Sequence, residues 1–177
     1  MNWRSEWTPR PVSSAKLRDI EQAIGEIERL LEKGDEAAAA DKVRLLNQTC
    51  GRNESVWLFR DYRESGSITE LALRLSQPAP VRVGNVKREE WVELVRRIQD
   101  PEYSEAVSRD SLPLPDSGQA KLSDGDRFAF LQDFYLDVLT ANVSMPGLSD
   151  LIFWDDLEPE EIADRIQAYR PIQLPPG

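Results

Sequence analysis

Histidine is absent from this chain of 177 residues, and cysteine occurs once. Histidine is the commonest general base and the commonest metal ligand, so its absence removes the usual routes to acid–base and metal-dependent catalysis. The single cysteine, Cys50, can form neither a disulfide within the chain nor a cysteine-rich zinc site. We expect Cys50, which precedes Gly51 at a predicted helix end, to be a packed thiol rather than a nucleophile, because no histidine can activate it.

Sequence patterns for other chemistry are missing as well. The chain contains no phosphate-binding loop, zinc-ligand spacing, nucleophile elbow or calcium loop. Neighbouring acids such as Asp155 and Asp156 are explained by helix capping and by the helix dipole. The three acids within residues 150–156 are expected to attract a divalent cation only weakly, because no glycine-bearing loop surrounds them. We therefore expect no enzyme, no cofactor and no metal.

Long hydrophobic runs are also absent. No apolar stretch approaches the length of about 20 residues that a membrane-spanning helix needs. The first residues, which include Arg4, Glu6 and Arg10, lack the apolar core of a signal peptide. A composition of 40% hydrophobic and 31% charged residues is typical of a folded chain in water. We expect a cytoplasmic protein that does not bind membranes.

Negative charge is concentrated in the last third of the chain. The net charge is −10, and residues 116–177 contribute −8 of it, with 12 acids against 4 bases. Such a segment repels nucleic acid and attracts a basic protein, with a faster association rate at low salt. The alternative is that these acids only make the surface soluble.

The first half of the chain is predicted to consist of helices. Ser13 or Ser14 caps a first helix, and Gly34 ends it. A second helix runs from Asp35 to about Cys50, so that the two form an antiparallel hairpin. The other segments predicted here are an extended tail that docks on the body through Trp3 and Trp7 (1–12), two helices (54–64 and 67–76), and an extended linker (77–86), which is the best candidate for a domain boundary.

The second half is also predicted to be helical, which makes the fold all-α. Helices are expected at residues 85–100, 123–143, 149–154 and 158–170, with a long surface loop at 101–122 because that stretch holds three prolines and little periodicity. In the helix at 123–143 the apolar stripe is wider than one face. Either this helix is nearly buried, or Phe130 and Phe134 lie on a second, exposed edge.

Residues 145–156 read Met-Pro-Gly-Leu-Ser-Asp-Leu-Ile-Phe-Trp-Asp-Asp and form the most informative stretch of the chain. Ser149 or Asp150 is a predicted cap of a short helix. One helical turn cannot hide all four side chains of residues 151–154, so one or two aromatic residues should reach the surface beside the acids. An exposed aromatic pair among carboxylates suits a protein-binding anchor. The alternative is that the run only fills the core.

The motif at residues 149–154, followed by acids, by the run 158–162 (Glu-Pro-Glu-Glu-Ile) and by Tyr169-Arg170, resembles the colicin/pyocin-type immunity proteins that protect bacteria from nuclease toxins. The amphipathic helix at residues 87–98 is similar to the first helix of that family, and the order of the helices agrees. The resemblance covers about residues 85–174. It implies two domains, a helical N-terminal extension or subdomain (1–80) and a four-helix immunity-like domain (81–177).

The resemblance also implies a function and a site. Members of the family bind a nuclease toxin beside its active site and block access of nucleic acid, so the expected partner is a basic toxin nuclease. By the motif, Asp150, Phe153 and Trp154 would form the anchor, and Leu151 with Ile152 would hold the short helix to the core. The other residues expected to contribute are the following acids Asp155 and Asp156 and, from their surface position alone, Asp133, Asp137 and Thr140 of the second helix.

This chain departs from the family pattern in three places. The family usually has tyrosines where Phe153 and Trp154 stand, the connection at residues 101–122 is longer, and residues 1–80 have no counterpart in the small immunity proteins. An alternative function is therefore a non-catalytic interaction or scaffold module that uses the same surface for a partner other than a toxin.

Overall fold

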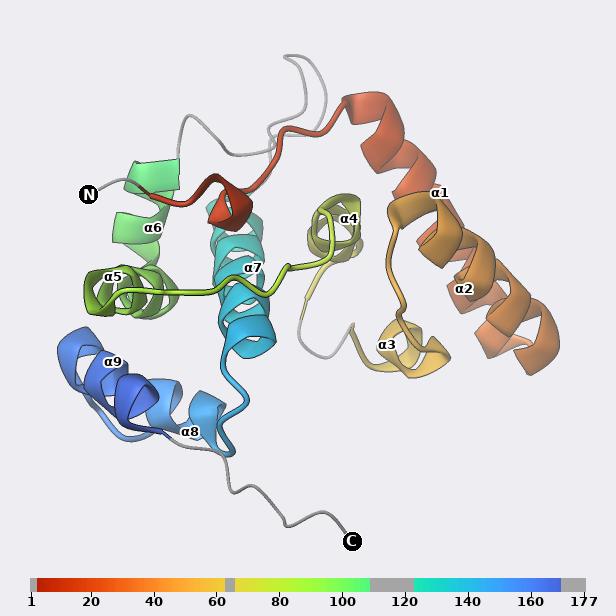
Figure 1. The fold of residues 1–177 in the computed structure, drawn as a ribbon. Coiled ribbons are helices and arrows are strands. Elements are labelled where there is room, and N and C mark those ends of the chain that lie inside the picture. Colours follow the sequence, from red (N-terminus) through yellow and green to blue (C-terminus); the bar gives the residue numbers. More distant parts are fainter. Residues whose placement is uncertain (1–2, 63–65, 109–122, 170–177) are drawn as a thin grey trace, which may run out of the picture. The chain divides into compact units, whose positions relative to one another are not determined.

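A computed structural model of the chain describes residues 3–62, 66–108 and 123–169, and every regular element within these ranges is helical, which confirms the all-α prediction. No helix in these ranges is both long and apolar enough to cross a membrane. The elements are the short 3-10 helix η1 (Ser5–Trp7) and the helices labelled in Figure 1, which are α1 (Ser14–Glu32), α2 (Glu36–Cys50), α3 (Val56–Asp61), α4 (Ile68–Ser76), α5 (Arg88–Gln99), α6 (Pro101–Ser108), α7 (Asp124–Asn142), α8 (Leu148–Phe153) and α9 (Pro159–Ala168).

The chain forms two compact units. Unit 1 contains residues 1–7, 80–106 and 131–177, and unit 2 contains residues 8–79 and 107–130. The predicted domain boundary at residues 80–81 stays a prediction. Each unit is described by itself below.

Unit 2 is built around α1, which packs against α2, α3 and α4 (Figure 1). The predicted hairpin is confirmed, because Ser13 and Asp35 cap α1 and α2, and Gly51 ends α2 with a φ of 66° that suits glycine. Cys50 is buried, and burial raises the pKa of its thiol, in keeping with a packed side chain. The helix predicted at 54–64 is shorter, Val56–Asp61, and residues 63–65 lie outside the described part.

Two helix N-termini in unit 2 are joined through one carboxylate. Ser67 caps α4 and Ser123 caps α7, because their Oγ atoms accept hydrogen bonds from the backbone N–H groups of Glu70 and Asp126 (3.1 and 3.0 Å). Both serine hydroxyls also donate to the Asp126 carboxylate, at 2.7 Å from Ser67 and 2.6 Å from Ser123. These hydrogen bonds lower the pKa of Asp126. The ionised carboxylate therefore holds the starts of α4 and α7 together.

Asp126→Asn is expected to lower the free energy of unfolding at pH 7 by about 1 kcal/mol, because an amide has one acceptor oxygen for two donating serines. Since the pKa of Asp126 is lowered in the folded chain, its stabilisation is full above the unfolded pKa, about 3.9, and is lost as the pH falls through the folded pKa. Urea unfolding at several pH values measures both effects. Asp124→Asn, two residues away and highly exposed, is the matched control. An equal effect of both variants would contradict the prediction.

In unit 1 the N-terminal segment is docked, as predicted, although residues 5–7 form a turn of 3-10 helix rather than an extended chain. Trp7 is fully buried, with its ring 5.6 Å from that of Trp91 on α5 and 5.6 Å from that of Trp3. The guanidinium of Arg4 donates to both carboxylate oxygens of Glu90, at 2.6 and 2.9 Å. Residues 3–7 are thus packed into unit 1, with Trp7 in its core.

Residues 101–108 form a helix, so the predicted surface loop at 101–122 is wrong for this part; residues 109–122 lie outside the described ranges. Pro101 occupies the first helical position, where its missing N–H costs nothing. The carboxylate of Asp100 accepts a hydrogen bond from the backbone N–H of Tyr103 (2.9 Å) and so acts as the cap. The Tyr103 hydroxyl donates to Glu93, which holds α6 against α5.

The wide apolar stripe of α7 is explained by burial rather than by a second exposed edge. Phe130 and Phe134 are 1% and 7% exposed. The Tyr135 hydroxyl accepts a hydrogen bond from Arg97 of α5 (2.8 Å), and α5 also packs along α9 and touches α8. Of the alternatives for residues 123–143, the nearly buried helix is therefore the observed one.

Candidate protein-binding surface

The short helix α8 begins at a glycine turn. Gly147 is the N-cap, with a φ of 71°, a left-handed conformation that strains other residues. The predicted cap at Ser149 or Asp150 is therefore wrong: both residues lie inside the helix, because the left-handed turn starts α8 two residues earlier. The backbone N–H of Leu151 donates to the carbonyl of Gly147 (3.0 Å) and closes the first turn.

The side chains of α8 are divided between the core and the surface. Leu148, Leu151 and Ile152 are buried, so the prediction that Leu151 and Ile152 hold the helix to the core is confirmed. Phe153 is 42% exposed and Trp154 is 80% exposed. Both aromatic side chains thus lie at the surface of unit 1, in agreement with the prediction that one or two aromatic residues of this run are exposed.

The residues that follow α8 are fixed to α5 by one glutamine. The side-chain amide of Gln99 donates to the carbonyls of Ile152 (3.0 Å) and Leu157 (3.1 Å), which bracket the exposed residues 153–156. Asp156 has a φ of 49°, so the backbone turns sharply there. The aromatic pair is therefore carried on a short segment held at both ends.

Gln99→Ala is expected to increase amide hydrogen exchange of residues 153–157, because two carbonyls lose their donor, with a local loss of stability of about 1–3 kcal/mol. Gln132→Ala is the matched control, since the Gln132 amide donates to the carbonyl of Ile98 (3.1 Å), outside this segment. Exchange resolved by peptide measures the effect. Equal protection of residues 153–157 in both variants would show that Gln99 does not hold the segment.

The acids of this surface differ in their pairing. Asp155 lies 3.6 Å from Arg165. On α9, Asp164 pairs with Arg88 at 2.5 Å, which lowers the pKa of Asp164. Among the residues that the structure describes, no cation pairs with Asp150 or Asp156, and both are exposed. Their negative charge is therefore available to a partner beside the aromatic pair.

The predicted residues of the second helix lie on α7. Asp133, Asp137 and Thr140 are spaced by four and three residues, which places them on one face of the helix. Thr140 is exposed, and the two aspartates are partly exposed. The Thr140 hydroxyl donates to the carbonyls of Leu136 (2.9 Å) and Asp137 (3.1 Å). Of the three, Thr140 is the one that lies near residues 149–150 of the motif.

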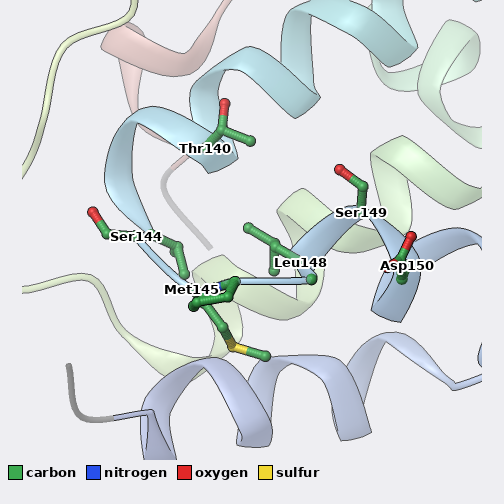
Figure 2. A pocket seen from close by; sticks show the side chains of 9 residues that line it. Thr140, Ser144, Met145, Leu148, Ser149 and Asp150 are labelled. Carbon is green, nitrogen blue, oxygen red and sulfur yellow. The ribbon is translucent and has the colours of Figure 1, made fainter. Parts of the chain in front are cut away.

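A hollow of about 420 Å³ separates the end of α7 from α8, and the residues around it come from the last turn of α7, the glycine turn and the first turn of α8. Figure 2 shows Thr140 across this hollow from Ser149 and Asp150, with Ser144 and Met145 on the connecting turn. The hollow thus brings together two of the predicted site residues, Thr140 and Asp150. Asp133 and Asp137 do not line it.

Sequence reasoning missed that Gln99 holds the chain after α8, that Gly147 is the N-cap of α8, and that Met145 lines the hollow. The Pro-Gly pair at residues 146–147 was the available signal for a left-handed turn. The role of Gln99 depends on contacts more than 50 residues away in the chain, which no local pattern reveals.

In the described part of the chain, no group of three or more Asp, Glu or Cys side chains is placed to hold a metal ion. No protein-family model, no curated protein and no solved structure matches this chain.

Proposed function

We propose that this chain is an immunity protein, which binds a basic bacterial nuclease toxin and inhibits it. The observation that carries the proposal is the pair of exposed aromatic side chains, Phe153 and Trp154, beside the carboxylates of Asp150 and Asp156, which no cation of the described residues pairs with. Large aromatic residues that are desolvated on binding dominate the energy of many protein interfaces. The resemblance of residues 149–162 to the immunity family gives this surface its partner class.

The physics of such an inhibitor follows from charge and shape. An acidic helical surface occupies the place where a nuclease would bind phosphates, and the opposite charges speed association. The aromatic pair, once buried in the partner, slows dissociation. A segment fixed by Gln99 loses little conformational freedom on binding, which leaves more of the contact energy for affinity.

The test uses the product of the gene next to the one that encodes this chain. The two proteins are mixed, and nuclease activity and association rate are measured at low and at high salt. We expect inhibition at a one-to-one ratio and a slower association at high salt, because salt screens the attraction between exposed charges. Full nuclease activity in the presence of excess protein would overturn the proposal. Stable binding without inhibition would favour the alternative, a non-catalytic scaffold that uses the same surface.

A further inference from the structure

The hollow between α7 and α8 has the polar groups of a cation site. Asp150 is the one charged side chain among the described residues that line it, and three hydroxyl groups come from Thr140, Ser144 and Ser149 (Figure 2). Met145, Pro146 and Leu148 supply apolar wall. A site with a carboxylate, several hydroxyl acceptors and an apolar side suits a long cationic side chain, whose stem is apolar and whose head is charged.

The end of α7 adds negative potential to the same place. The last carbonyl groups of a helix have no partner within the helix and carry partial negative charge. Within the described part of the chain, no donor is bonded to the carbonyl oxygens of Thr140 and Ala141. The terminal turn that contains them lines the hollow through Thr140 and Val143. The first turn of α8 lines the same hollow, and its free N–H groups carry partial positive charge that offsets part of this potential. The full negative charge of the Asp150 carboxylate therefore decides the preference for a cation.

We propose that this hollow receives an arginine side chain of the partner protein, an inference that rests on the proposed function. Arginine fits better than lysine because its planar head has five N–H donors, which can serve the carboxylate and several neighbouring oxygens together. The guanidinium is also less strongly hydrated than an ammonium group, so it enters a partly enclosed site at lower cost. The hollow thus selects the position of one basic residue, while Phe153 and Trp154 provide the apolar contact beside it.

The first test needs no toxin. The chain has two methionines, so a sample labelled at the methionine methyl groups gives two signals, and Met145→Leu identifies the one from the hollow. Ethylguanidinium chloride is titrated in, with butylammonium chloride, neutral ethylurea and sodium chloride as comparisons. We expect a saturable shift of the Met145 signal with ethylguanidinium, a weaker response to butylammonium, and none to ethylurea or salt.

Matched variants separate the hollow from the rest of the surface. Asp150→Asn should weaken ethylguanidinium binding about fivefold or more, because a charge-assisted hydrogen bond becomes a neutral one. Asp164→Asn, which alters a carboxylate that pairs with Arg88 and does not line the hollow, should leave it unchanged. An unsaturable shift, or the same response in Asp150→Asn and the unaltered chain, would overturn the inference.

The second test uses the toxin and distinguishes the two proposals. Ser149→Leu fills the hollow from an exposed position and should weaken toxin binding about tenfold or more by excluding the arginine. Toxin binding that is unchanged in Ser149→Leu would overturn the inference while the proposed function stands. If the toxin does not bind the unaltered chain, the proposed function fails, even where ethylguanidinium binds the hollow.

Discussion

Replacing Trp7 with alanine is expected to lower the free energy of unfolding of unit 1 by about 3–5 kcal/mol, the usual cost of removing a large aromatic side chain from a core. Trp7 has no exposed surface and lies between the rings of Trp3 and Trp91. The cavity left by Trp7 would also loosen the packing of α5, because Trp91 of α5 would lose its contact with the Trp7 ring. Because α5 also holds α9 and the segment after α8, the candidate surface should become less ordered as unit 1 loosens.

Urea unfolding followed by tryptophan fluorescence and by amide hydrogen exchange measures this effect. Trp57→Ala is the matched control: Trp57 is 64% exposed on α3 and the guanidinium of Arg60 lies over its ring, so we expect a change of no more than about 1 kcal/mol. Trp7→Phe should cost less than Trp7→Ala, because an aromatic ring, although a smaller one, still fills part of the space and the buried Nε1 of Trp7 has no acceptor among the described residues. Equal stability of Trp7→Ala and Trp57→Ala would mean that the N-terminal segment is not part of the core.

A fragment that starts at residue 81 is a second test of the contact between the N-terminal segment and α5. Such a fragment contains the whole stretch that resembles an immunity domain but lacks Trp7 and Arg4. We expect it to be destabilised by at least as much as Trp7→Ala, because the Arg4–Glu90 ion pair is lost as well. A fragment as stable as unit 1 of the whole chain would contradict the observed packing.

The other large effect is expected on binding. Trp154→Ala together with Asp150→Ala should weaken toxin binding by about 3–5 kcal/mol, which corresponds to about 100- to 5,000-fold in Kd, as is typical when a hot-spot aromatic and a paired charge are both removed. Both side chains are exposed in the free chain, so the free energy of unfolding should stay within about 0.5 kcal/mol of the original. A reduced affinity would therefore report on recognition and not on folding.

Calorimetry or surface binding measures the affinity, and a nuclease assay measures inhibition. Trp57→Ala serves again as the control, since it removes an exposed tryptophan from unit 2. The single variants show how the effect is shared: if the two residues contact the same region of the partner, their separate losses should not add up to the loss of the double variant. Unchanged inhibition by the double variant would rule out this surface as the anchor.

The sequence predicted most of the fold because the helix signals are local. Ser13, Asp35 and Gly51 mark helix ends at the positions where the structure has them. The spacing of apolar residues predicted the course of the helices between such ends. The helix α6 was missed because the three prolines and the weak periodicity of residues 101–122 indicated a loop, although Asp100-Pro101 is a start signal. The choice between a buried and an exposed edge on α7 depended on neighbours distant in sequence, which periodicity does not contain.

The candidate site was predictable in part, because some of its features depend only on local sequence. The division of residues 151–154 into buried and exposed pairs follows from the length of one helical turn. The hollow could not be predicted, because it exists only where the end of α7 meets α8 at the left-handed Gly147. The support from Gln99 likewise needs the packing of α5 against the chain after α8.

The N-terminal contact has a consequence for the order of folding. Arg4 and Glu90 are separated by 86 residues in the sequence, and the separation between Trp7 and Trp91 is almost as large. During synthesis the helices α1–α4 can pair as they emerge, whereas Arg4 and Trp7 remain without Glu90 and Trp91 until α5 is complete. Contacts of such long sequence separation slow folding. The segment that holds Arg4 and Trp7 is synthesised before α1–α4 but is therefore expected to reach its native place after them.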